Sequence, residues 1–536
     1  MTQLRFGFLI FPILLLSLAF TNTAIANSQK VGSKYHEDPE NGYRFKPLKD
    51  FEGVPIPPDQ RGSGLIGKMS GKSQIIKIED GGVASLGTDL VVYAMMNPEI
   101  KEVEKGHTSG KRARPDVMTI IGKQYRGLDN IRSKPEVDER LEIKKVEVHH
   151  RVFRPDAGQF EMIVDVWSFN LEHADVCLVY VFSADKDKKW LAATKKSAKT
   201  FSLIDRVLAE VAAPGEKQTY DQLMVSAEAE AARTEGWRAV PTPSERFIIL
   251  TSAEKKSFVD KVIKRLEISR DVFEKDFPPP PNFNAVSIVR LCGSEEEFHT
   301  YGDTGGGVAG WFNPRTTELV LYDAVNTNRN MSFAVMSHEA FHQYCHFLFG
   351  QSEAHRWFDE GHGDYYGGIK ITGKKAKIER QMPAGLDRLR VIQEMVRKHT
   401  YRPLEKHINY THGQWQSYGV PSYAQSWSII YFLRQGALRK VRGKMWKKEY
   451  ANILPAYVET LSGGFAAEYD KIRAKHQKKA DKEGRELTDA ERTPTRKDLP
   501  SDAKDRIWKA AMEASWGQID IDQFEADWIE YVDDEL

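Results

Sequence analysis

The stretch from Val335 to Tyr366 reads VMSHEAFHQYCHFLFGQSEAHRWFDEGHGDYY. It contains the pentad H-E-A-F-H, in which His338 and His342 enclose Glu339, and Glu360 follows eighteen residues after the second histidine. Residues four apart on a helix lie on one face, so both imidazoles can reach the same ion. Two histidines and a glutamate are a ligand set of catalytic zinc sites, and the enclosed glutamate would lie beside the open position. The pattern predicts a metal site and makes a hydrolase the leading hypothesis.

A chance pentad is the competing interpretation, with odds of about three in a hundred for this composition. A buried amphipathic helix with two hydrogen-bonded histidines would have the same letters. Against chance, Glu360 supplies a third ligand. Asp364 lies four residues later, where on a helix it would share the face of Glu360 and could orient a ligand histidine. The apolar residues that would seat the first helix in a core are Val335, Met336, Phe341 and Tyr344.

Two motifs in this stretch, S-H-E-A-F-H-Q and W-F-D-E-G-H-G-D-Y, resemble the gluzincin metallopeptidases. The similarity is to the aminopeptidase-N branch, with H-E-x-x-H-Q and W-x-x-E-G-x-x-x-Y, and to the peptidase-MA-like domains of secreted bacterial proteins. It covers roughly residues 247–436. The metzincin pattern does not fit, because Cys345 and Leu348 stand where it requires glycine and histidine.

The resemblance implies a site chemistry, residue by residue. His338, His342 and Glu360 would hold Zn²⁺, and Asp364 would be an outer carboxylate. Glu339 would be the general base that takes a proton from water activated by the metal and returns it to the leaving amine.

The family also uses a tyrosine or histidine to stabilise the oxyanion. Tyr423, which begins an apolar helical run, matches the place of that tyrosine, although a tyrosine there could equally be a packing residue. Tyr418 and His412 are the alternates. The neighbouring histidines interpreted as loop or shell residues rather than ligands are His346, His355 and His362, the last being the replacement ligand if Glu360 does not bind.

Upstream, three glycines at 305–307 lead to Gly310, Trp311 and Phe312. In gluzincins an edge strand before the active helix pairs with extended substrate, and these residues could form that strand. The glycines would then let substrate approach closely. A hairpin with a loose glycine turn is an equal alternative. The G-x-M-E-N motif of the aminopeptidase branch is missing from the sequence, so aminopeptidase specificity is not supported.

Residues 1–26 predict a cleavable secretory signal with Arg5, an apolar core and the cleavage site Ala24-Ile25-Ala26. The apolar run, at about fifteen residues, is too short to span a bilayer. No other segment approaches the roughly twenty apolar residues that a membrane span needs. We therefore expect an exported protein, periplasmic or extracellular, without a membrane span. Residues 27–60 predict a polar, Pro-rich linker.

Residues 61–215 predict a β-rich α/β domain that weakly resembles the small PsbP-like sandwich of exported proteins. Residues 240–380 alternate strands and helices in the order expected of a gluzincin N-lobe with the zinc site, and 381–536 predict a helical C-lobe. Within the C-lobe, residues 471–505 are highly charged and predict an exposed, partly disordered insertion. The expected fold is therefore α+β, a small α/β sandwich followed by a two-lobed zincin-like domain with a mainly helical C-lobe.

The charge balance bears on possible binding partners, and the cysteine count bears on disulfide bonds. Loss of Arg5 with the signal leaves 76 basic residues against 76 acidic ones, which argues against nucleic acid or an anionic membrane as partner. Three cysteines are too few for a disulfide scaffold, so free buried thiols or a single bridge are expected.

Together these features predict an exported zinc metallopeptidase that acts on peptides or partly unfolded proteins. The alternatives are a catalytically inactive gluzincin-like module for binding or envelope assembly, and an amide hydrolase with a non-peptide substrate. The sequence does not indicate an oligomeric state.

Overall fold

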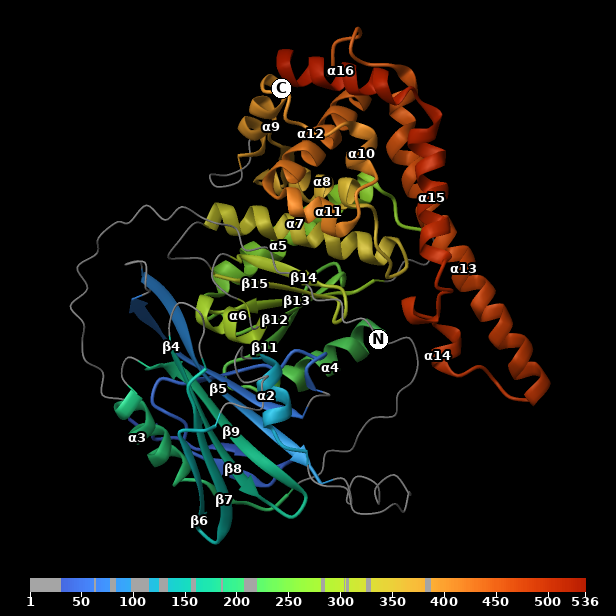
Figure 1. The fold of residues 1–536 in the computed structure, drawn as a ribbon. Helices are drawn as coiled ribbons and strands as arrows, with labels where there is room; N and C mark the ends of the chain where they lie inside the picture. Colours follow the sequence, from blue (N-terminus) through green and yellow to red (C-terminus); the bar gives the residue numbers. More distant parts are fainter. Residues whose placement is uncertain are drawn as a thin grey trace. The chain divides into compact units, whose positions relative to one another are not determined.

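The computed structural model describes most of the chain in two parts. About 48% of it is helix and 23% strand, so the fold is α+β, as the sequence predicted (Figure 1). Unit 1 comprises described residues within 1–213, 230–236 and 294–308, and unit 2 those within 214–229, 237–293 and 309–536. The predicted signal lies outside the described residues, which are 30–61, 64–77, 83–97, 115–124, 134–155, 161–184, 187–206, 219–280, 285–302, 304, 308–323, 329–380 and 387–536.

Unit 1 is built on a seven-stranded antiparallel sheet. Its central strands are buried on both faces, because α3 (Asp187–Ala198) covers one face and α2 (Met118–Gln124) the other. A strand alternates its side chains between faces, so Trp167 packs towards α3 while Val166 packs towards α2. The strands in sheet order are β3 (Glu52–Val54), β4 (Leu65–Lys77), β5 (Val83–Met96), β9 (Ala174–Ser183), β8 (Met162–Asn170), β7 (Val146–Phe153) and β6 (Val137–Ile143).

The prediction of a linker at 27–60 is wrong for the described part of this segment, because that part folds into unit 1. A second, three-stranded sheet joins β1 (His36–Asp38), β2 (Tyr43–Phe45) and β10 (Ser202–Leu203). Tyr43 and Phe45 are fully buried, and the Tyr43 ring stacks on Phe201 at 5.5 Å. Two aromatic residues at strand spacing therefore outweigh the polar composition around them.

Unit 2 contains a five-stranded mixed sheet that carries the candidate site. Three parallel strands form its centre, and an antiparallel strand lies at each edge. The predicted edge strand at 310–312 is present as β14. In sheet order the strands are β11 (Arg238–Pro241), β12 (Phe247–Thr251), β13 (Ser287–Cys292), β15 (Glu318–Tyr322) and β14 (Gly310–Asn313).

The expected N-lobe, 240–380, is interrupted between β13 and β14. There α6 (Glu295–Gly302) belongs to unit 1. Its last turn is capped by Lys68, whose Nζ donates to the Thr300 carbonyl at 3.1 Å, and the Thr300 hydroxyl donates to Asp89 at 3.1 Å. Such long-range contacts carry no local sequence signal, which is why the predicted domain boundary misses them.

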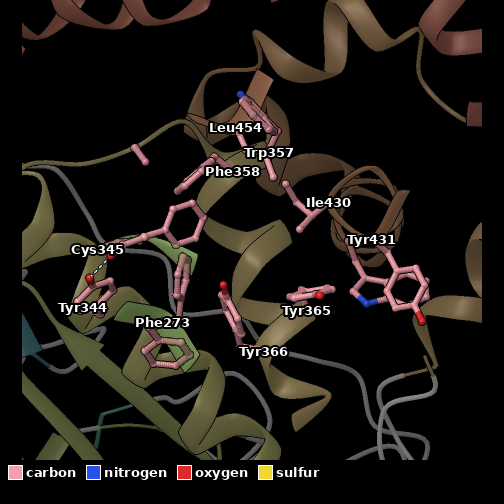
Figure 2. Packing of buried hydrophobic residues seen from close by; sticks show 14 of the residues in the cluster. Phe273, Tyr344, Cys345, Trp357, Phe358, Tyr365, Tyr366, Ile430, Tyr431 and Leu454 are labelled. Atoms are coloured by element: carbon pink, nitrogen blue, oxygen red, sulfur yellow. Dashed lines mark hydrogen bonds between the residues drawn. The ribbon is translucent and has the colours of Figure 1, made fainter. Parts of the chain in front are cut away.

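Helices cover the mixed sheet and bury an aromatic core. α7 (Arg329–Leu348) packs on β14 and β15, and the Gln343 side chain donates to the carbonyls of Ile288 and Thr317, which ties the helix to the sheet. α8 (Arg356–Gly367) packs against α7 and α12 (Val420–Ala437). In Figure 2 rings from α5 (Lys256–Asp276) and α8 meet, with Phe273 and Tyr366 4.7 Å apart.

No helix in the described part of the chain is long and apolar enough to cross a bilayer. The three cysteines are buried free thiols. The remaining elements are α4 (Tyr220–Ala232), β16 (Ile369–Thr372), β17 (Lys375–Ile378), α9 (Arg388–Arg397), α10 (Leu404–Ile408), α11 (His412–Tyr418), η3 (Lys448–Asn452), α13 (Ile453–Glu483), α14 (Asp489–Arg492), η4 (Arg496–Asp498), α15 (Ala503–Ser515), η5 (Trp516–Gln518) and α16 (Ile521–Asp534).

The charged segment 471–505 is more ordered than predicted. Its first third continues α13, because lysine, alanine, glutamine and glutamate all favour helix. Its end contacts the loop between α7 and α8, where Arg496 and Lys504 both pair with Glu353 at 2.5 and 2.9 Å. High charge predicts disorder for a segment on its own, whereas here Arg496 and Lys504 find a partner in Glu353.

Candidate metal centre

Three predicted ligands converge in unit 2. His338 and His342 lie one turn apart on α7, with ring centroids 4.6 Å apart, and Glu360 approaches from α8. Oε2 of Glu360 is 3.3 Å from Nε2 of His338 and 3.5 Å from Nε2 of His342. One ligand atom from each residue lies within 4.8 Å of the others. This His₂Glu donor set fits a zinc ion that keeps a further position open.

Each histidine is oriented by an aspartate on α8. Nδ1 of His338 lies 3.1 Å from Asp364, which Arg388 holds in turn at 2.6 Å, and Nδ1 of His342 lies 2.7 Å from Asp359. Asp364 was predicted in this role, and Asp359 was missed. The available signal was its position immediately before Glu360, together with the need of the second imidazole for an acceptor.

These contacts set the protonation of the ligands. Burial alone lowers the pKa of His338, but Asp364 and Glu360 outweigh it and raise the pKa to about 9. For His342 burial is likewise outweighed by Asp359 and Glu360, and the pKa lies well above its usual value. Burial raises the pKa of Glu360, yet the two histidines lower it well below the usual range. With Nδ1–H donated to an aspartate, each Nε2 faces Glu360, where a metal would replace a proton.

Glu339 lies beside the edge strand β14. Its Oε2 accepts a hydrogen bond from the Phe312 backbone N–H at 3.0 Å, and burial raises its pKa. Of the predicted strand residues, Phe312 therefore lies at the site. Gly310 is different from its expected role, because a Cβ there would lie 2.8 Å from Leu321 and 3.0 Å from Val335. That glycine serves packing on β15 and α7, and glycines 305–307 lie outside the described residues.

The structure brings Tyr423 to the same site. It lies in the first turn of α12 with 4% of its surface exposed, and its ring packs on Trp415 at 4.3 Å and under Arg388 at 4.8 Å. Burial and the charges of Glu360 and Asp364 raise its pKa well above the usual value, so its hydroxyl keeps its proton.

Of the two alternates to Tyr423, Tyr418 has its contacts elsewhere and His412 lies near the site. Tyr418 donates its hydroxyl to the Thr400 carbonyl, with Arg402 over its ring. His412 is exposed at the first turn of α11 but lies near the site. Its pKa is lowered by partial burial and by the charge of Arg356, against an opposing effect of Glu360.

Three further histidines flank the ligands and lie outside the metal cluster of the described residues, namely His346, His355 and His362. His362 is fully buried, with Nδ1 donating to the Phe358 carbonyl at 2.8 Å and Nε2 accepting from Arg434 at 3.2 Å. Nδ1 of His355 lies 2.8 Å from the Tyr457 hydroxyl. The contacts of His355 and His362 agree with the shell interpretation, and the His346 ring packs against Phe312 at 5.3 Å.

Gly363 has a role that the sequence did not reveal. A Cβ at this position would lie 2.8–3.0 Å from three atoms of the His338 imidazole, too close for either group to stay in place. The glycine in E-G-H-G-D therefore leaves room for the ligand ring where α8 crosses α7.

We expect Gly363→Ala to lower zinc affinity by about 10-fold or more, in the range seen when the support of a ligand is disturbed. The measurement is a zinc titration in competition with a chromophoric chelator. Gly413→Ala is the matched control, because a Cβ at Gly413 meets no atom within 4 Å. Equal zinc affinities of the two variants would contradict the assignment.

Comparisons with known proteins do not indicate a function for this chain. No family model matches the chain, and no curated protein matches it significantly. A solved chain from Bacteroides thetaiotaomicron VPI-5482 is similar at 8% identity, over 64% of this chain and 84% of that chain, with a TM-score of 0.18. At this TM-score the likeness carries no argument.

Proposed function

We propose that this protein is an exported zinc metallopeptidase that hydrolyses peptide bonds. The observation that carries the proposal is the convergence of His338, His342 and Glu360, with Glu339 placed between this cluster and the edge strand β14. A binding module would need the ligands but has no need of a buried carboxylate beside them.

The proposed chemistry divides between the metal and the chain. Zinc, when bound, supplies a Lewis acid that acidifies water and polarises the scissile carbonyl. Glu339 takes the proton of the attacking water and delivers it to the leaving amine. Asp364 and Asp359 hold the two imidazoles by Nδ1, so that Nε2 of each ring stays directed at the ion. Tyr423 offers a protonated hydroxyl for the oxyanion.

The edge strand supports a peptide as substrate. Within the described residues, β14 pairs with β15 on one side only, so its other edge can pair with an extended chain. The Phe312 N–H lies on this open side, and its bond to Glu339 places the proposed base next to where such a chain would run. Strand addition binds a chain through hydrogen bonds to its backbone, which suits peptides and partly unfolded proteins as substrates.

Metal removal tests the proposal. The purified protein is expected to contain one zinc per chain and to cleave a peptide library. Dialysis against 1,10-phenanthroline should abolish cleavage, and added zinc should restore it. His338→Gln should lose zinc, while His399→Asn, a change at an exposed position with φ of 52° that asparagine tolerates, should retain it. Zinc-free wild-type protein would refute the site, and zinc-loaded protein without cleavage would refute the peptidase.

A further inference from the structure

Arg356 contacts the third ligand from the first turn of α8. Its Nη1 lies 3.0 Å from Oε1 of Glu360 and 3.9 Å from Oδ2 of Asp359. The other oxygen of Glu360, Oε2, is the one that faces both histidines. The two oxygens of this carboxylate therefore have separate partners, one a guanidinium and the other the metal cluster.

Helix stability does not account for an arginine at this position. A positive charge in the first turn opposes the helix dipole, and arginine preceding glutamate by four residues is the weaker order of such a pair. The Arg356 side chain is also only 25% exposed, so it has lost much of its hydration. Glu360 and Asp359 provide most of the compensation, with a smaller part from Glu353, and the first two act on the candidate metal centre.

We propose that Arg356 is a positioning residue that makes Glu360 a one-oxygen ligand, an inference that rests on the proposed zinc site. With Oε1 bound to the guanidinium, only Oε2 is free to turn towards Nε2 of the histidines. A second carboxylate oxygen on the ion would occupy the position that a catalytic site keeps open for water or substrate. Arg356 also faces Asp359, so one side chain links the third ligand to the carboxylate that orients His342.

A role through charge and a role through positioning predict opposite changes in zinc affinity when Arg356 is removed, so the two can be told apart. If Arg356 acts only by its charge, its removal takes a cation away from a cation site and zinc should bind more tightly. If it positions Glu360, its removal should weaken zinc binding by about 10-fold, as loss of other outer contacts to ligands does.

The experiment compares zinc affinities of the full chain and its variants by chelator competition. Arg356→Met keeps the apolar stem of the side chain, and Arg356→Lys keeps the charge without the planar fork. The matched control is Arg390→Met, which removes the exposed arginine of the i,i+4 pair Arg390–Glu394 in the same unit.

We expect weaker zinc binding for Arg356→Met, an intermediate affinity for Arg356→Lys and an unchanged value for Arg390→Met. Absorption of the Co²⁺-substituted protein should also change in Arg356→Met, because the guanidinium no longer fixes the orientation of the Glu360 carboxylate. Tighter or unchanged zinc binding with an unchanged cobalt spectrum would overturn the role.

Other outcomes separate this inference from the proposed function. If Glu360→Gln leaves zinc affinity unchanged, Glu360 is no ligand, and both the site and the role of Arg356 fall. If zinc binds but no peptide is cleaved, only the proposed peptidase function is refuted. The zinc affinities of the Arg356 variants still decide whether Arg356 positions Glu360.

Discussion

Replacing Glu339 by glutamine is expected to lower kcat for peptide cleavage by roughly 10²–10⁴-fold while zinc stays bound. Glutamine has nearly the same shape and can still accept the hydrogen bond from the Phe312 N–H, so strand β14 should keep its place. What is lost is the carboxylate that takes the proton from water. The measurement pairs zinc content with steady-state kinetics on a cleaved peptide.

Glu394→Gln is the matched control, because Glu394 is exposed on α9 and pairs with Lys398 there. It should retain both zinc and activity. Equal activity of Glu339→Gln and wild type would exclude the proposed mechanism, even if zinc is present. Loss of zinc in Glu339→Gln would instead indicate that Glu339 supports the metal site.

Tyr423→Phe is expected to lower kcat by roughly 10²-fold with little change in KM, because a hydroxyl that stabilises the oxyanion acts mainly in the transition state. The substitution removes one oxygen atom and leaves the ring against Trp415 and Arg388. Kinetics and thermal unfolding of the same samples separate catalysis from packing.

The control for this change is Tyr431→Phe, which lies two turns later on α12 and packs on Trp427 at 5.4 Å. It should leave kcat unchanged. If Tyr423→Phe keeps the wild-type rate, the tyrosine belongs to the core alone. A lower melting temperature without a lower rate would lead to the same conclusion.

Local patterns predicted much of the fold around the site. The apolar spacing in 335–344 predicted a helix with a buried face. Met336, Phe341 and Tyr344 are buried as expected, and Val335 is half-buried. The pentad predicted that His338 and His342 face the same way, which their ring distance of 4.6 Å bears out. These predictions succeed because helical periodicity is a property of neighbouring residues.

The failures concern contacts between distant segments. In the described part of 27–60, β2 pairs with β10 far along the chain, and α6 leaves the expected lobe to pack within unit 1. The charged segment 471–505 finds its partners at Glu353, more than a hundred residues earlier. The composition of a segment indicates its local structural preference. It does not indicate which distant strand or carboxylate the segment will contact in the folded protein.

The sequence by itself determined the candidate ligands, their common helix face and the outer carboxylate Asp364, because helix geometry and ligand chemistry follow from residue type and spacing. Only the tertiary structure decided how the ligands are held. Asp359 and Gly363 act across the crossing of α8 and α7, where they meet His342 and His338. Arg356 contacts Glu360 within α8, but the oxygen left to the metal cluster is defined by the histidines of α7. The angle and register of two packed helices are set by the whole aromatic core beneath them, so no local motif could specify them (Figure 2).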